Sequence, residues 1–446
     1  MQLIDKAKTL LNSIRQSKFT RNVVTVAAGT MVAQLIALIA APILTRLYDP
    51  AAFGIFGIFT TVAGLLVPIA ALSYPAAIVL PRNDLGARQV VRLAVLTAVL
   101  ISGCTGVALV LAQDLMVRLF GTEELRLYLY LIPVFMLFSA LMQVARQWRI
   151  RQRDFTVLAT SNIAQAMVIN TIQVAFGLFA PSASALISTQ TFSHILHAGI
   201  LVISRPSIKE NAAMDLVAPR EQSPVPTIIA TAREFRDFPM YRAPEQLANT
   251  ASQSLPLVLL AAFFGPVVAG LYTICRTVLS LPTRLLGESV GAVFYPRITR
   301  SILDGTNPTQ LLLKATILLA IVAAVPFAAV VLFGPSLFTF VFGSEWTVAG
   351  EFARWVAVWR YFDLLRQPAV QALPALKAQR WHLQFTLVTV GLRAAALSIG
   401  YLFYDSAHVS VALFSLVGAI CSILLIWIVV RRIDRFGGHY GRYPSS

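Results

Sequence analysis

Charged residues are scarce in this 446-residue chain. Only 13% of its residues are Asp, Glu, Lys or Arg, whereas 57% are hydrophobic and the mean hydropathy is +0.73. Soluble domains carry about 25% charged residues. The composition therefore excludes an ordinary soluble domain and predicts a polytopic membrane protein.

Cysteine and histidine are also rare. The three cysteines, Cys104, Cys275 and Cys421, all fall inside predicted helices, so neither a disulfide framework nor a thiolate metal site is expected. His194 and His197 are three residues apart and share one helical face, but no further Cys, His or Asp cluster accompanies them. They could line a polar cavity, relay protons or simply pack between helices, and we expect no metal and no cofactor.

Catalytic motifs are missing as well. The segment "GESVG" (287–291) matches the G-x-S-x-G nucleophile elbow, but it lies inside a predicted membrane helix, where small residues favour close helix packing. No nucleotide-binding G-x-x-x-x-G-K-[ST] motif occurs. We therefore expect no catalytic residues and a protein that is not an enzyme.

Acidic residues are few, at 20 against 36 Lys and Arg, which gives a net charge of +16. Most of the basic residues lie in the N-terminus, the even-numbered connections and the C-terminus, which argues against nucleic acid as the partner. This bias is the positive-inside pattern of a multi-pass membrane protein. It predicts that both termini are cytoplasmic.

Long apolar runs dominate the chain. A bilayer core about 30 Å thick needs about 20 apolar residues per helix. On that scale we predict about twelve spans, near 23–45, 53–79, 89–112, 127–148, 156–179, 183–204, 243–264, 267–294, 311–334, 349–373, 382–403 and 408–430. The fold class is therefore all-α.

The spans form two sets of six. We predict an amphipathic cytoplasmic segment (1–22), an N-terminal six-helix bundle (23–204), a cytoplasmic linker (205–240), a C-terminal six-helix bundle (241–430) and a basic cytoplasmic tail (431–446). "YDPAAFGIF" (48–56) aligns with "FGPVVAGLY" (264–272), which indicates an internal repeat. Because six is even, the repeats are parallel, as in transporters that alternate the access of a central cavity.

Several arginines lie within predicted spans, where each costs roughly 2.5 to 3.5 kcal/mol to insert. Arg284 is four residues before Glu288 and can pair with it, whereas Arg276 and Arg393 have no acidic residue within one turn. In the tenth span local pairs are possible among Glu351, Arg354, Arg360, Asp363 and Arg366. The positive balance predicts a cavity that selects an anion, while His194, His197, Glu245 and Glu288 are candidates for ion or proton coupling.

The stretch "GTMVAQLIALIAAPILTRLYDPAAFGIFGIFTTVAGLLVPIAALSYPAAIVLPRND" (29–84) resembles the bacterial lipopolysaccharide and polysaccharide repeat-unit flippases (Wzx type). These belong to the superfamily of the multidrug exporters and the lipid II flippase. "FRDFPMYRAPEQLANTASQSLPLVLLAAFFGPVVAGLY" (235–272) is similar to the same group.

This resemblance implies a V-shaped alternating-access fold of two six-helix bundles. Its cargo would be an undecaprenyl-pyrophosphate-linked oligosaccharide in the lipid bilayer, with a polymerase and a chain-length regulator as further partners. It also implies a pyrophosphate-binding role for Arg276 in "CRTVLSLP" and a gate or structural role for Arg46 in "LTRLYDP".

Two alternatives remain open from the sequence. An ion-coupled multidrug or small-molecule antiporter of the same superfamily would be expected to place acidic residues in its cavity. A membrane enzyme of the same pathway would need a large outer loop, which the chain lacks.

Overall fold

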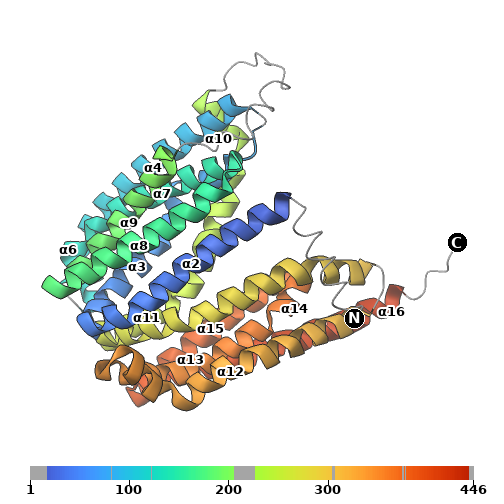
Figure 1. The fold of residues 1–446 in the computed structure, drawn as a ribbon. Helices are drawn as coiled ribbons and strands as arrows, with labels where there is room; N and C mark the ends of the chain where they lie inside the picture. Colours follow the sequence, from blue (N-terminus) through green and yellow to red (C-terminus); the bar gives the residue numbers. More distant parts are fainter. Residues whose placement is uncertain are drawn as a thin grey trace. The chain divides into compact units, whose positions relative to one another are not determined.

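The computed structural model describes residues 18–81, 83–121, 123–204, 227–303, 307–373, 376 and 378–440. Over these residues the chain is α-helical and contains no strand, so the predicted all-α class is confirmed (Figure 1). Most of the predicted amphipathic segment, much of the 205–240 linker and the end of the basic tail lie outside this part of the chain.

The chain divides into two compact units. Unit 1 comprises Met1–Tyr48 and Ile58–Ser254, and unit 2 comprises Asp49–Gly57 and Leu255–Ser446. The chain passes from one unit to the other three times: between Tyr48 and Asp49, within α3 (Pro50–Ala70) and within α11 (Ala243–Leu303).

Unit 1 is built on α2, α4, α7, α8 and α9, which lie side by side: α2 against α8, α8 against α9, α9 against α7, and α7 against α4 (Figure 1). Its helices beside α3 and the start of α11 are α2 (Lys18–Leu47), α4 (Asp84–Leu111), α5 (Gln113–Phe120), α6 (Leu125–Leu129), α7 (Leu131–Arg151), α8 (Phe155–Phe179), α9 (Ala183–Ile203) and α10 (Ile228–Glu234). The segments are helical because a helix pairs its own backbone groups inside a bilayer, and apolar side chains fill the space between the helices.

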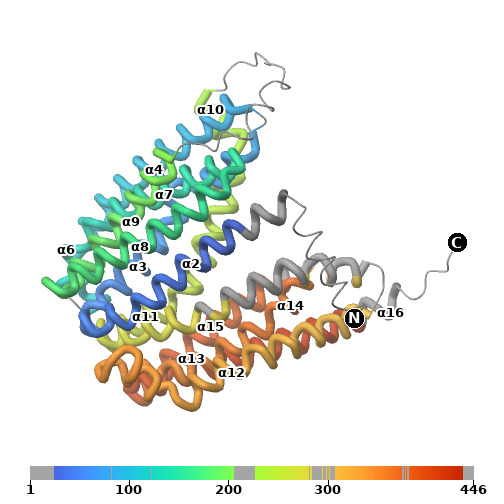
Figure 2. The backbone as a smooth tube through the Cα atoms, viewed as in Figure 1, coloured from blue at the N-terminus to red at the C-terminus, as the bar shows by residue number. Residues whose placement is uncertain are grey.

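Unit 2 has a similar construction. Figure 2 follows its backbone through α12 (Pro308–Phe342), α13 (Thr347–Leu365), α14 (Gln367–Ala372), α15 (Gln379–Tyr404) and α16 (Ala407–Tyr440). The α13 helix packs against both α12 and α16, and α16 packs against α15. Two short connections, 343–346 and 405–406, lie at the same end of this unit.

Ten helices within the described residues are long and apolar enough to cross a membrane. One of them, Phe238–Ser280, contains parts of both the seventh and the eighth predicted spans. Gly265 divides it, because its φ of 82° and ψ of −176° are not helical and Pro266 follows. The tenth predicted span corresponds to α13, which is not among these ten helices because it contains several charged residues.

The two copies of the repeated sequence motif contact each other in unit 2. Pro50 and Gly54 open α3, and Pro266 and Gly270 occupy the same spacing after the break in α11. A Cβ added to Gly54 would collide with the carbonyl oxygen of Pro266, and one added to Gly270 would collide with that of Pro50. The two glycines therefore allow α3 and α11 to cross with their backbones in contact, in a reciprocal arrangement.

Candidate functional site

A buried carboxylate with two arginines lies near the end of α13. The Asp363 side chain is 10% exposed, and its Oδ1 accepts a 2.7 Å hydrogen bond from Nε of Arg366. Arg360, on the other side along the same helix, brings Nη1 to 3.7 Å from Oδ2. Because three residues separate Asp363 from each arginine, all three side chains share one helical face.

Arg393 of α15 adds a third positive charge to the same region. Its guanidinium carbon lies 3.9 Å from the ring centroid of Trp359 and 3.9 Å from that of Phe414. Arg360 also stacks on Trp359, at 4.4 Å. Aromatic faces are negative and attract such cations, so the two rings hold the Arg393 side chain in place without neutralising its charge.

The α11 helix contributes two further residues to this cluster. Tyr272 is buried, and its hydroxyl lies within electrostatic range of three arginines, which are Arg276, Arg360 and Arg393. Arg276 follows one turn later on α11 and is partly buried. We call Arg276, Arg360, Arg366 and Arg393, together with Asp363 and Tyr272, the arginine cluster of unit 2.

The cluster has spare hydrogen-bonding capacity. Within the described residues, Nε and Nη2 of Arg393 and Nε of Arg360 are buried and have no hydrogen-bond partner. Leaving such groups unsatisfied is costly, and a bound anion is the partner that would satisfy them best. With four arginines and one aspartate, the cluster favours a ligand with more than one negative charge.

Two predicted site residues, Arg276 and Arg393, thus come together in unit 2. The sequence analysis did not assign Arg360 and Arg366 to the site, although each lies three residues from Asp363 and so could share a helical face with it. The predicted local pairing is confirmed for these two arginines, since both pair with Asp363. The predicted pairing is wrong for Glu351, which pairs with His408 of α16, and for Arg354, whose Nε donates to the backbone oxygen of Val331.

The other predicted site residues lie elsewhere. Arg46 is exposed in the last turn of α2, and Glu245 is exposed in the first turn of α11, both in unit 1. The backbone of α11 continues through Arg284 and Glu288, but their side chains lie outside the described part of the structure, and their predicted pairing stays a prediction.

The two histidines of α9 lie among other side chains of unit 1. The His197 ring is buried, with Nε2 3.3 Å from Oγ of Ser161. The His194 ring meets Phe135 edge-on, with centroids 4.5 Å apart. Among the described residues there is no group of three or more His, Cys, Asp or Glu that could hold a metal ion.

Comparisons with known proteins give this arrangement a context. The family profile described as "Polysaccharide biosynthesis protein" matches residues 19–302, more than half of the chain. The chain belongs to this family. It is 21% identical over 314 residues to the succinoglycan biosynthesis transport protein ExoT of Rhizobium meliloti (strain 1021). That match covers 69% of this chain and 59% of the relative, so the chain spans less than two thirds of the relative's length.

Solved structures share the fold. An inward-facing multidrug resistance MATE family transporter of the MOP superfamily aligns with a TM-score of 0.69 at 13% identity, covering 90% of this chain and 95% of its own. The lipid II flippase MurJ, in an inward closed conformation, aligns at 0.66 and 10% identity, covering 95% and 94%. The chain is therefore a multi-pass membrane protein with the fold of MATE and MurJ transporters.

Proposed function

We propose that this protein flips undecaprenyl-pyrophosphate-linked oligosaccharide repeat units across the bacterial inner membrane. The units would serve the synthesis of a surface polysaccharide, whether O-antigen, capsule or exopolysaccharide, and would move by alternating access between the two bundles. The polysaccharide biosynthesis family and the ExoT relative support the substrate class. The MurJ fold supports flipping of a lipid-linked saccharide.

The observation that carries this proposal is the arginine cluster of unit 2. A pyrophosphate diester carries two negative charges and several acceptor oxygens. Guanidinium groups bind such oxygens through paired N–H donors. We assign the pyrophosphate to Arg276 and Arg393, with Arg284 and Arg46 as further basic residues along its path.

The positive-inside bias favours cytoplasmic N- and C-termini. The resemblance to the repeat-unit flippases implies the direction of transport, in which the cargo enters from the cytoplasmic leaflet and leaves to the periplasmic one. A polymerase and a chain-length regulator would take the flipped unit. His194, His197, Glu245 and Glu288 are the candidates for coupling transport to protons or another ion.

An ion-coupled multidrug antiporter is the alternative, favoured by the fold of the MATE neighbours. Such a protein exports organic cations and needs unpaired acidic groups to bind them. The arginine cluster has the opposite sign. If this alternative holds, deletion of the gene lowers drug resistance and leaves lipid-linked oligosaccharides normally distributed between the leaflets.

Replacement of Arg276 tests the proposal. In a deletion strain that traps lipid-linked repeat units in the inner leaflet, we expect Arg276→Ala to lower flipping about tenfold or more, the usual worth of a charge-assisted hydrogen bond. Arg276→Lys should restore only part of the rate, because a lysine keeps the charge without the planar fork. Abundance of each variant is measured in parallel.

Arg118, an exposed arginine of α5, provides the matched control. Arg118→Ala should flip at the wild-type rate. Wild-type flipping by a well-expressed Arg276→Ala protein would contradict the proposed role.

A further inference from the structure

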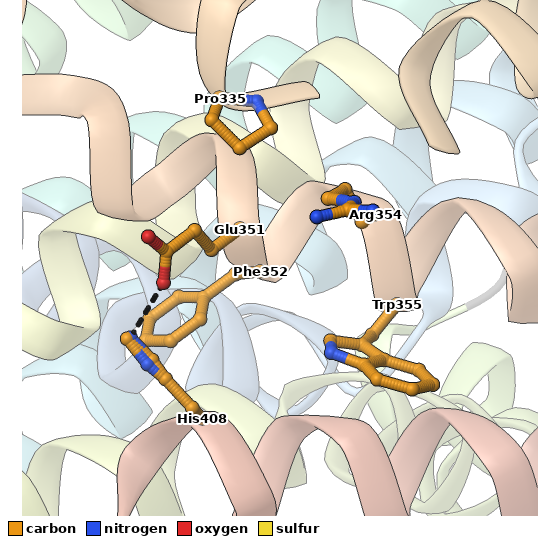
Figure 3. A pocket seen from close by; sticks show the side chains of 6 residues that line it. All are labelled: Pro335, Glu351, Phe352, Arg354, Trp355 and His408. Carbon is orange, nitrogen blue, oxygen red and sulfur yellow. Dashed lines mark ion pairs between the residues drawn. The ribbon is translucent and has the colours of Figure 1, made fainter. Parts of the chain in front are cut away.

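A cavity opens at one end of unit 2, between α12, α13 and α16. It has a volume of about 190 Å³ and is lined by Pro335, Glu351, Phe352, Arg354, Trp355 and His408 (Figure 3). It lies toward the start of α13, before Trp359 and Asp363 along the helix, and none of its lining residues belongs to the arginine cluster. The short 343–346 and 405–406 connections mark this end, which the charge distribution assigns to the outer side of the membrane.

The helix packing explains why Arg354 lies in this cavity. Pro335 has no N–H, so the carbonyl oxygen of Val331 one turn earlier lacks its helical partner. The Nε of Arg354 donates to that oxygen at 2.8 Å. Gly334 makes room for the stem of the arginine, since a Cβ there would lie 2.8 Å from Cγ of Arg354.

Only one nitrogen of the guanidinium is used by this contact. Within the described residues, the two terminal nitrogens of Arg354 make no hydrogen bond. They are fixed in direction by the Nε contact and remain available as a two-pronged donor for phosphate oxygens.

An acidic group stands across the cavity. The carboxylate of Glu351 is about half exposed, and one oxygen lies 3.1 Å from Nε2 of His408 (Figure 3). The His408 ring in turn packs against Phe352, with centroids 5.1 Å apart. One oxygen of Glu351 thus lies beside His408, and the side chain is exposed enough for the carboxylate to accept hydrogen bonds from a cation.

Further along the same helices, apolar side chains are exposed. Leu332 and Phe333 of α12 and Leu416 and Ile420 of α16 are exposed on the surface of unit 2, and Trp355 is exposed at the cavity itself. In a membrane-spanning unit such a surface suits hydrocarbon chains, and an indole suits the interface. A soluble sugar would make no use of it.

We propose that this cavity binds the headgroup of a phospholipid that carries a primary amine. Its phosphate lies on the terminal nitrogens of Arg354, its ammonium group donates to Glu351, and its acyl chains run along α12 and α16. Phosphatidylcholine matches the phosphate but offers no N–H to Glu351. Phosphatidylglycerol offers no cation at all.

Native mass spectrometry of the purified full-length protein tests this site. Dioleoyl phosphatidylethanolamine, phosphatidylcholine and phosphatidylglycerol are titrated separately. We expect the wild-type protein to retain one molecule of phosphatidylethanolamine with an affinity about tenfold higher than for the other two, since one charge-assisted hydrogen bond distinguishes them.

Glu351→Gln should remove that preference while leaving the affinity for phosphatidylcholine unchanged. Glu345→Gln, at an exposed acid outside the cavity, is the matched control and should keep the preference. Arg354→Lys should weaken the binding of all three lipids. Equal wild-type affinity for the three lipids, tighter binding of phosphatidylglycerol, or an unchanged preference in Glu351→Gln would each overturn the proposal.

Discussion

Buried and partly buried arginines are held in this protein by three different kinds of partner. Arg149 of α7 donates to the backbone oxygens of Leu201 and Ser204 at the C-terminal end of α9 and pairs with Asp154 at 3.3 Å. Arg366 pairs with a carboxylate, and Arg393 is held by two aromatic rings. The first two arrangements neutralise or saturate the guanidinium. Stacking on aromatic rings leaves the N–H donors of Arg393 available for a ligand. This difference distinguishes a structural arginine from one that can bind a ligand.

Asp363 should hold the arginine cluster together. Replacing it with asparagine leaves Arg360 and Arg366 without their carboxylate in a buried setting, so we expect the protein to lose about 3 kcal/mol of stability. Melting temperature and abundance in detergent report the loss. The double variant Asp363→Asn with Arg366→Gln should recover part of it, because one of the stranded charges is removed.

Asp114 provides the comparison for that experiment. It pairs with Arg126 at a similar distance, 2.8 Å, but both side chains are exposed. Asp114→Asn should therefore cost less than about 1 kcal/mol. Equal losses for Asp363→Asn and Asp114→Asn would show that burial does not set the strength of the α13 pair.

At the scale of helices, prolines and glycines decide where elements break and how closely they approach. Gly265 and Pro266 divide α11 into two spans. Pro335 leaves α12 helical but frees a carbonyl oxygen, which a side chain of α13 then satisfies. The crossing of α3 and α11 depends on Gly54 and Gly270, because only a hydrogen atom fits between the two backbones.

Substitution of Gly54 tests this crossing. Gly54→Ala forces a methyl group into the backbone of α11, so we expect a loss of about 1 to 3 kcal/mol or a separation of the two helices. Gly64 on the same helix has no neighbouring atom within 4 Å of an added Cβ, and Gly64→Ala should be neutral or stabilising. Thermal unfolding of the two variants is compared, and equal melting temperatures would rule out the close crossing.

At the scale of the whole molecule, the distribution of basic residues sets the predicted orientation. The connections near 81–88 and 146–154 are basic and should be cytoplasmic, whereas 113–126 should face the periplasm. Two exposed positions report on this, Asn83 before α4 and Glu123 after α5.

Single cysteines test the orientation in a background in which Cys104, Cys275 and Cys421 are replaced by alanine. In intact spheroplasts an impermeant thiol reagent should label Glu123→Cys and leave Asn83→Cys unlabelled until the membrane is permeabilised. The reverse pattern would overturn the predicted topology.

The sequence by itself determined the membrane class, the helical fold, the positions of most spans and the family. Each of these follows from local composition: a bilayer imposes a fixed length of apolar residues, and a helix satisfies its backbone within its own segment. The i+3 spacing around Asp363 likewise predicted pairs within one helix. The internal repeat, in which Pro266 and Gly270 match Pro50 and Gly54, could also be recognised in the amino-acid sequence.

The tertiary structure alone decided which distant residues meet. Arg393 of α15 contacts Trp359 of α13 and Phe414 of α16. Glu351 pairs with His408 and not with Arg354 one turn away, because Arg354 donates to the backbone oxygen of Val331. Spacing along one helix predicts its own face, but it contains no information about which face of another helix packs against it. The assembly of the arginine cluster and of the lipid cavity therefore depends on packing between helices, which is long-range in sequence.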